Sequence, residues 1–214
     1  MKITGSRPLD MPERHQITGA ILAGGMGRRM GGVDKGLVEV AGQPMVAWTI
    51  DRLKPQVGRM LINANRSQDA YAAFGLPIVE DQHSGFQGPL AGLHAVLSAA
   101  DTPYVAIVPC DTPRLPTDLL ARLGTALEQD DSELATAEAG GRVHTLHGLF
   151  QRELLTDLTR ALADGERKPD AWYATRRWSR VNFDDQADAF DNINTPEQRD
   201  ALSADIRSQA KIPT

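Results

Sequence analysis

Three short apolar segments set the fold class of this chain. They lie at 18–22 (TGAIL), 59–63 (RMLIN) and 104–108 (YVAIV), and each leads into a glycine, asparagine or aspartate. Continuous apolar runs of this length are typical of strands that are buried on both faces of a parallel sheet. Helical patterns separate these segments. The alternation predicts a single-domain, three-layer α/β/α fold with a mostly parallel, Rossmann-like doubly wound sheet.

Proline and capping signals mark where the expected helices begin. The expected helices span 45–54, 90–100 and 154–162, and a last one begins after 195. Pro44 and Pro89 stand at the start of the first two, where a missing N–H is no loss. Thr195 and Gln198 have capping-box spacing, which predicts the start of the last helix. We expect a polar tail at 1–16, a domain at 17–204 and a second tail at 205–214.

Composition and charge exclude several classes of protein. Lys and Arg number 23 against 28 Asp and Glu, a net charge of -5, so we do not expect a protein that coats nucleic acid, which needs a broad basic face. Cys110 is the one cysteine, which excludes an internal disulfide. Residues 1–16 contain charges and prolines where a secretory signal needs an apolar run, and no segment has the roughly twenty apolar residues of a membrane span. We expect a soluble, cytoplasmic protein without membrane contact.

A glycine-rich basic segment at 21–37 (ILAGGMGRRMGGVDKGL) follows the first expected strand. It is not a Rossmann fingerprint, because Met30 stands where the last glycine would be, and it is not a Walker A loop, because an aspartate precedes Lys35. Glycines nevertheless let backbone N–H groups approach phosphate oxygens, and Arg29 and Lys35 can neutralise negative charge. The segment indicates a phosphate-binding loop, with a flexible loop of solvated charges as the alternative.

Three loops are expected on one rim, because ligands of doubly wound sheets bind beyond the carboxyl ends of the strands. The loops are 24–32, 63–66 and 109–113. Within the last of them, Asp111 is a candidate ligand for Mg²⁺, since this hard cation prefers carboxylate oxygens and shares its shell with phosphate. An aspartate before Thr-Pro also occurs in ordinary turns, so the residue alone leaves both interpretations open.

The motifs of these loops, taken in order, resemble a known family. They are LAGG, RMGGVDKGL, GQPM, NANR, ED, GPLAG, PCDTP and NINTPE, and they run from about 18 to 199. The pattern is similar to that of the nucleotidyltransferases and, most closely, of the molybdenum cofactor guanylyltransferases, the MobA family. The resemblance implies the fold of the nucleotide-diphospho-sugar transferases, with a GTP-binding half at about 17–113 and an acceptor half at about 114–204.

The resemblance also implies a reaction. The phosphate of molybdenum-molybdopterin attacks the α-phosphorus of GTP, which gives the guanine dinucleotide cofactor and pyrophosphate, with Mg²⁺ as cofactor. Such a transfer depends on positioning and charge stabilisation and needs no covalent enzyme intermediate. The implied partners, besides the two substrates, are molybdenum insertion proteins and apo-molybdoenzymes or their chaperones, in transient contacts.

The nucleotide side of the implied site comes from the strand ends. The implied GTP-binding residues are Leu22, Ala23, Gly24, Gly25, Gly27, Lys35, Asn63, Asp81 and Asp111. Arg29, Lys35 and Asp111 would be catalytic, with Lys35 facing the charge that develops on the leaving pyrophosphate and Asp111 holding the metal. Asn63 and Asp81 supply an amide and a carboxylate, which could read the N1–H and amino donors of guanine.

The acceptor side of the implied site is drawn from the second half of the chain. Asn192, Asn194 and Lys168 match the family's acceptor-binding stretches. An asparagine before a helix is otherwise a common cap. Three further residues could line the same channel: Arg142, His144 and His147. A histidine on a strand is more often structural.

Two other functions stay open. A cytidylyltransferase acting on the same acceptor would share the fold, but its relatives tend to read LAAG in the first loop and to lack PCDTP, so Gly24 and Cys110 argue against it. A non-catalytic carrier of molybdopterin or nucleotide would need neither a metal site nor leaving-group neutralisation. The presence of both Lys35 and Asp111 therefore favours turnover.

Overall fold

The computed structural model describes residues 11–23, 26–27, 33–81, 88–193 and 195–209. Its strands are β1 Ile17–Ala23, β2 Met26–Gly27, β3 Val33–Asp34, β4 Glu39–Val40, β5 Gln43–Pro44, β6 Arg59–Ala64, β7 Ile78–Val79, β8 Tyr104–Pro109, β9 Leu134–Ala139, β10 Arg142–Gln151 and β11 Trp178–Asn182. Its α-helices are α1 Met45–Leu53, α2 Gln68–Ala72, α3 Pro89–Ala99, α4 Leu119–Gln129, α5 Leu155–Ala163, α6 Pro169–Tyr173 and α7 Pro196–Gln209. Its 3-10 segments are η1 Arg14–Gln16, η3 Lys35–Leu37, η4 Lys54–Gln56, η5 Arg152–Leu154 and η6 Asp184–Phe190.

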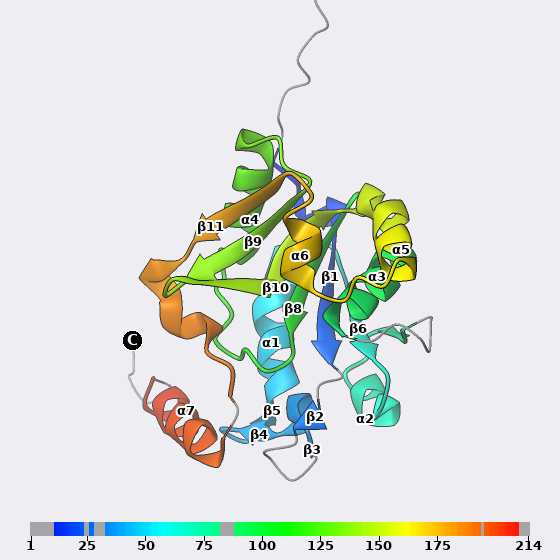
Figure 1. The fold of residues 1–214 in the computed structure, drawn as a ribbon. Coiled ribbons are helices and arrows are strands. Elements are labelled where there is room, and N and C mark those ends of the chain that lie inside the picture. Colours follow the sequence, from blue (N-terminus) through cyan, green and yellow to red (C-terminus); the bar gives the residue numbers. More distant parts are fainter. Residues whose placement is uncertain (1–10, 24–25, 28–32, 82–87, 194, 210–214) are drawn as a thin grey trace, which may run out of the picture.

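A seven-stranded sheet forms the centre of the molecule (Figure 1). Its strand order is β11-β9-β10-β8-β1-β6-β7. Strand β1 pairs in parallel with β6 on one side and with β8 on the other, and β10 is antiparallel to both of its neighbours. The sheet is therefore mostly parallel, as predicted, and strands from both halves of the sequence share it.

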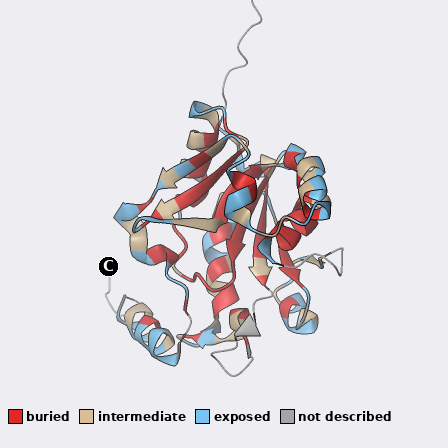
Figure 2. Cartoon of the chain, viewed as in Figure 1, coloured by how far each residue is buried: buried red, intermediate tan, exposed pale blue. Residues whose placement is uncertain are grey.

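Helices cover both faces of the sheet (Figure 1). Helices α1 and α4 pack on one face, and α3, α5 and α6 pack on the other. Side chains of β1 alternate between these two layers: Ile21 belongs to the core under α1 and α4, whereas Ala20 belongs to the core under α3. Figure 2 shows that the central strands are buried along most of their length, which explains why they read as continuous apolar runs.

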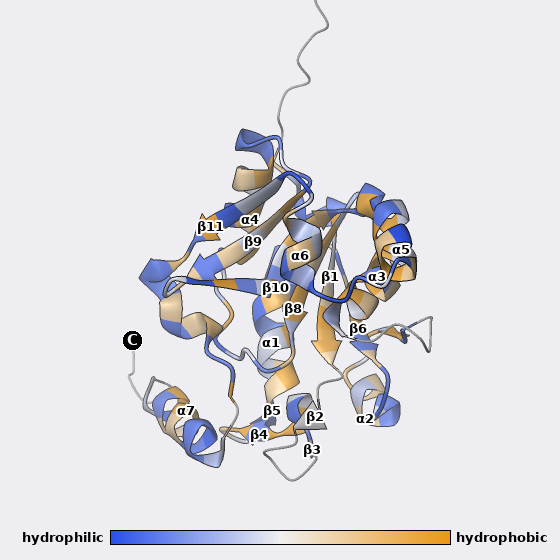
Figure 3. Cartoon of the chain, viewed as in Figure 1, coloured by the Kyte–Doolittle hydropathy of each residue, from blue (hydrophilic) through white to orange (hydrophobic). Residues whose placement is uncertain are grey.

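The three predicted strands and the helix starts are confirmed. Strands β1, β6 and β8 contain the three apolar segments, and in Figure 3 the carboxyl-terminal end of β1 is strongly hydrophobic. Pro89 is the first residue of α3. At the start of α7 the capping box is formed: the Thr195 N–H donates to Gln198 Oε1 at 3.1 Å, and the Gln198 N–H donates to Thr195 Oγ1 at 3.3 Å.

The structure differs from the sequence prediction at the expected second tail. Helix α7 continues to Gln209, five residues past 204. The reason is a small apolar cluster in which Leu202 and Ile206 pack with Val40 of β4 and Met45 of α1. No helix in the part of the chain that the structure describes is long and apolar enough to cross a membrane.

Candidate functional site

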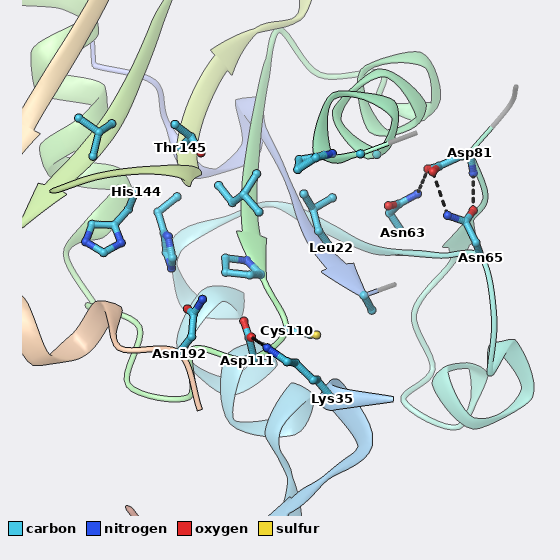
Figure 4. A pocket seen from close by; sticks show the side chains of 18 of the residues that line it. Leu22, Lys35, Asn63, Asn65, Asp81, Cys110, Asp111, His144, Thr145 and Asn192 are labelled. Atoms are coloured by element: carbon cyan, nitrogen blue, oxygen red, sulfur yellow. Dashed lines mark hydrogen bonds and ion pairs between the residues drawn. The ribbon is translucent and has the colours of Figure 1, made fainter. Parts of the chain in front are cut away.

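A cavity of about 460 Å³ opens at the carboxyl ends of the parallel strands (Figure 4). Residues from the ends of β1, β6 and β8 line one part of it, and residues from β10 line another. Its lining residues are Leu22, Ala23, Lys35, Asn63, Asn65, Asp81, Gly88, Pro89, Gly92, Pro109, Cys110, Asp111, Arg142, Val143, His144, Thr145, Leu146, His147 and Asn192. The cavity thus lies where the sheet topology predicts a ligand site.

One corner of the cavity is a carboxylate held by two amides. Asn63 Nδ2 donates to Asp81 Oδ1 at 2.9 Å, and Asn65 Nδ2 donates to Asp81 Oδ2 at 2.9 Å. The Asp81 N–H donates in return to Asn65 Oδ1 at 2.8 Å. These bonds, drawn in Figure 4, fix the plane of the Asp81 carboxylate, and each of its oxygens retains acceptor capacity for a ligand.

A glycine of α3 makes room for this corner. A Cβ at Gly92 would lie 2.7 Å from Asn63 Oδ1 and 3.3 Å from Leu22 Cδ2. Asn63 also donates to the Val79 carbonyl at 3.1 Å, so its amide is held from two sides. A side chain at position 92 would displace the Asn63 amide and with it the Asp81 carboxylate.

A second corner contains an ion pair. Lys35 Nζ lies 3.1 Å from Asp111 Oδ2, and the two side chains are 20% and 9% exposed. Asp34, the residue before Lys35, caps the turn η3 by accepting from the Gly36 N–H at 3.3 Å. Asp111 follows the end of β8, and its carbonyl accepts from the Ile193 N–H at 3.4 Å, which ties it to the segment of Asn192.

The third side of the cavity comes from an irregularity in β10. His144 is opposite Ala137 of β9, but Gly148 is opposite the adjacent Thr136, so residues 145–147 bulge out of the pairing. The bulge turns Thr145, Leu146 and His147 toward the cavity. The Tyr173 hydroxyl donates to the Thr145 carbonyl at 2.9 Å and stabilises this shape.

The two histidines of this wall are packed in an aromatic cluster. Rings of His144 and His147 lie 4.8 and 5.0 Å from the ring of Phe190. Burial, followed by the nearby His144, lowers the pKa of His147 to about 3, and burial also lowers the pKa of His144. His147 is therefore neutral at physiological pH. Lys35 and Arg142 carry the positive charges among the described lining residues.

Most of the described residues expected on the nucleotide side meet in this one cavity. These are Leu22, Ala23, Lys35, Asn63, Asp81 and Asp111, and Asn192, which we expected on the acceptor side, joins them. Arg142, His144 and His147 also line it. Gly27 lies in β2, which pairs with β3. Gly24, Gly25, Arg29 and Asn194 lie outside the described residues.

Lys168 lies apart from these residues. It is exposed at the start of α6 and does not line the cavity. The preceding residue, Arg167, comes nearer: its carbonyl oxygen is 3.6 Å from the position that a Cβ of Gly88 would occupy at the rim. The loop of Lys168 is thus a neighbour of the cavity, while the lysine itself is not part of its wall.

Sequence reasoning missed Asn65, Gly92 and the bulged residues Thr145 and Leu146. Asn65 stands within the NANR motif, two positions after Asn63, so strand alternation at the end of β6 could have placed both on one face. The bulge carries no comparable local signal, because it depends on the pairing of β10 with β9.

Asp111 is suited to a divalent cation that also contacts phosphate. Among the described residues there is no group of three or more His, Cys, Asp or Glu side chains that could hold a metal by themselves. A single carboxylate fits the manner in which Mg²⁺ is usually bound beside nucleotides, since substrate phosphates and waters fill the other positions. The donor set therefore fits a metal that arrives with a triphosphate.

Comparison with known proteins identifies the family. A family model described as a MobA-like NTP transferase domain matches residues 19–181. Molybdenum cofactor guanylyltransferase from Shewanella sp. (strain ANA-3) is 51% identical over 191 residues, which cover 89% of this chain and 97% of that relative. The protein of the same name from Shewanella pealeana is 47% identical over 194 residues, covering 91% and 97%.

Solved structures show the same fold. Molybdopterin-guanine dinucleotide biosynthesis protein A from Archaeoglobus fulgidus has a TM-score of 0.73 at 22% identity, covering 90% of this chain and 99% of that one. A manganese complex from Mycobacterium tuberculosis has a TM-score of 0.62 at 16% identity, covering 88% and 98%. The family model and the guanylyltransferase relatives place this α/β fold in the nucleotidyltransferase class. Within that class, the chain belongs to the MobA-like NTP transferase family.

Proposed function

We propose that this protein transfers GMP from GTP to the phosphate of molybdenum-molybdopterin, giving the guanine dinucleotide form of the cofactor and pyrophosphate. The observation that carries the proposal is the joint presence, in one cavity, of the Asp81 carboxylate between its two amides and the Lys35–Asp111 ion pair. The Asp81 carboxylate suits a guanine base, and the Lys35–Asp111 pair suits a triphosphate. The high identity to named guanylyltransferases over most of the chain supports the same reaction.

In the transfer, an oxygen of the acceptor phosphate attacks the α-phosphorus of GTP. A new P–O bond forms as the bond from the α-phosphorus to the bridging oxygen of the β-phosphate breaks, and pyrophosphate leaves with that electron pair. Lys35 would neutralise the charge that develops on the leaving group, and Asp111 would hold Mg²⁺, which supplies further charge neutralisation when it is bound. Asp81 would fix the base, so that the α-phosphorus is held in line with the acceptor.

The acceptor would enter along the wall formed by β10. Asn192 lines the cavity on the same side as Asp111, and the bulged segment of β10 closes the side that faces away from Asp81 (Figure 4). Arg142 contributes a positive charge near this entrance, which suits an anionic acceptor. Molybdenum insertion proteins and apo-molybdoenzymes or their chaperones would supply and remove the large cofactor in transient complexes.

The test is pyrophosphate release from the purified protein with Mg²⁺ and each of GTP, CTP, ATP and UTP, with and without molybdenum-loaded molybdopterin. Release with GTP, dependent on the pterin, is the expected result. Release with CTP instead would overturn the assignment of the base while keeping the chemistry. Binding of both ligands without release of pyrophosphate would show a carrier.

A further inference from the structure

The turn that carries Lys35 is fixed by a buried carboxylate. Asp34 is 7% exposed, and its Oδ1 accepts from the Gly36 N–H at 3.3 Å. Lys35 lies between the two residues that this hydrogen bond joins. Its backbone position, and hence the direction in which its side chain leaves the turn, depends on the Asp34 carboxylate.

A tyrosine from a distant helix donates to the same carboxylate oxygen. The Tyr71 hydroxyl, on α2, donates to Asp34 Oδ1 at 2.5 Å, and the tyrosine is 0% exposed. Burial, and then the neighbouring Cys110 and Asp34, raise the pKa of Tyr71 above its ordinary value. The phenol therefore keeps its proton and remains a donor. Asp34 Oδ2 has no hydrogen-bond partner in the described part of the chain, so these contacts to Oδ1 hold the carboxylate there.

The Tyr71 hydroxyl also lies very close to the backbone of the turn at Gly36. A Cβ at Gly36 would lie 2.5 Å from Tyr71 Oη and 3.1 Å from Cys110 Cβ. Cys110 immediately precedes Asp111, the ion-pair partner of Lys35. The turn is thus packed between α2 and the segment that carries Asp111, so the hydroxyl helps to set the separation of lysine and aspartate.

We infer that Tyr71 is a positioning residue for the transfer reaction: its hydroxyl, acting through Asp34, holds the turn that places Lys35 against Asp111. Tyr71 does not line the cavity, so its contribution passes through Lys35. The inference rests on the proposed function of Lys35 and adds a residue, Tyr71, whose hydroxyl holds Lys35 in place from the other side of the turn.

The first variant is Tyr71→Phe, which keeps the ring and removes the donor. We expect kcat with GTP to fall about tenfold while KM for GTP changes less than about twofold, because Lys35 acts most strongly as charge develops on pyrophosphate. Asp34→Ala, which removes the acceptor and keeps Tyr71, should reproduce the fall in kcat. An unchanged kcat in folded Tyr71→Phe overturns the inference.

A matched control separates positioning from stability. Thr18 and Thr102 share a buried hydroxyl–hydroxyl hydrogen bond of 2.7 Å at the amino end of β1, far from Lys35. Thr18→Val removes one buried hydroxyl from this hydrogen bond, just as Tyr71→Phe removes the hydroxyl that bonds to Asp34. It should lower the melting temperature and leave kcat unchanged. A similar fall in kcat in both variants would assign the effect of Tyr71→Phe to stability and overturn the inference.

A double variant shows whether the effect passes through Lys35. Single-turnover rates are measured at high enzyme concentration for Lys35→Ala with and without Tyr71→Phe. The second change should leave the rate of Lys35→Ala unaltered, because the side chain that the hydroxyl positions is gone. A further loss of about tenfold in this rate would contradict the positioning role of Tyr71 and leave the proposed role of Lys35 intact. Full activity of Lys35→Ala by itself would contradict the proposed role of Lys35.

Discussion

At the scale of single residues, the proposed recognition of guanine depends on the environment of Asp81. Asn63 and Asn65 each donate one hydrogen bond to a different oxygen of the Asp81 carboxylate. The carboxylate is therefore held in one plane with acceptor capacity left on both oxygens. Guanine presents two adjacent donors, N1–H and the 2-amino group, whereas the Watson–Crick edges of cytosine, adenine and uracil do not. A fixed carboxylate in this place thus suits guanine.

Asp81→Asn should abolish the preference for guanine. An amide offers one acceptor and one donor, so it cannot accept from both groups of guanine. Each lost charge-assisted hydrogen bond is worth about 1.5–3 kcal/mol. We expect kcat/KM to fall by at least about a hundredfold for GTP and by less for inosine triphosphate, which lacks the 2-amino group.

The ratio of kcat/KM for GTP to that for inosine triphosphate is the measurement for Asp81. Asp101→Asn is the control, because Asp101 is an exposed aspartate paired with Arg59 at the other end of the sheet. Its ratio should equal that of the unaltered protein. If the ratio is also unchanged in Asp81→Asn, the carboxylate does not read the base.

The position of a residue at the rim can be predicted from sequence where a recognisable strand ends. Asn63 and Asp111 could be placed at the rim because the apolar segments before them are continuous, and the structure brings both into the cavity. Asp81 follows the two-residue strand β7, which has no such signal, and only the family resemblance pointed to it. Tyr71 could not be found, because it contacts Asp34 across 37 positions of sequence.

At the scale of elements, parallel and antiparallel strands differ in how far sequence predicts them. Strands β1, β6 and β8 are buried on both faces and read as apolar runs, whereas the first half of β10 is partly exposed and contains Arg142, His144 and Thr145. The bulge in β10 shapes one wall of the cavity, and Gly148 stands directly after it. A Cβ there would lie 2.7 Å from Phe150 Cε2 and 3.2 Å from the Ala135 carbonyl oxygen.

Gly148→Ala should therefore destabilise the fold. Phe150 is 0% exposed and the Ala135 carbonyl is part of β9, so neither can move away freely. We expect the free energy of unfolding to fall by about 1–3 kcal/mol, measured by urea denaturation. Gly124→Ala in α4 is the control, because alanine favours a helix and the nearest atom to its Cβ would be Pro12 Cδ, at 3.2 Å. A loss no larger than that of the control would mean that the strand adapts easily.

At the scale of the whole molecule, the two halves of the sequence meet in one sheet and in one cavity. Nε2 of His147, from the second half of the sequence, lies 3.3 Å from Oγ1 of Thr112, in the segment that carries Asp111. The imidazole is 2% exposed and packs against Phe190. A neutral, buried side chain in the cavity wall thus joins the two halves, and charging it would require the packing between them to open.

This arrangement makes stability depend on pH. The pKa of His147 is about 3 in the folded protein, against 6.5 for an unperturbed histidine, so the unfolded chain binds more protons between these values. Stability is then fully present above about pH 6.5 and falls as the pH decreases, by at most about 1.4 kcal/mol per pH unit from this residue. His147→Gln, which cannot take up a proton, should lack this part of the dependence.

The measurement is urea unfolding of the unaltered protein and of His147→Gln, each at about pH 7 and about pH 5. Between these pH values the free energy of unfolding should fall by about 2 kcal/mol more in the unaltered protein than in His147→Gln. His144→Gln should produce a smaller change, because His144 is only half-buried. Parallel pH profiles of the unaltered protein and His147→Gln would contradict the assignment of this dependence to His147.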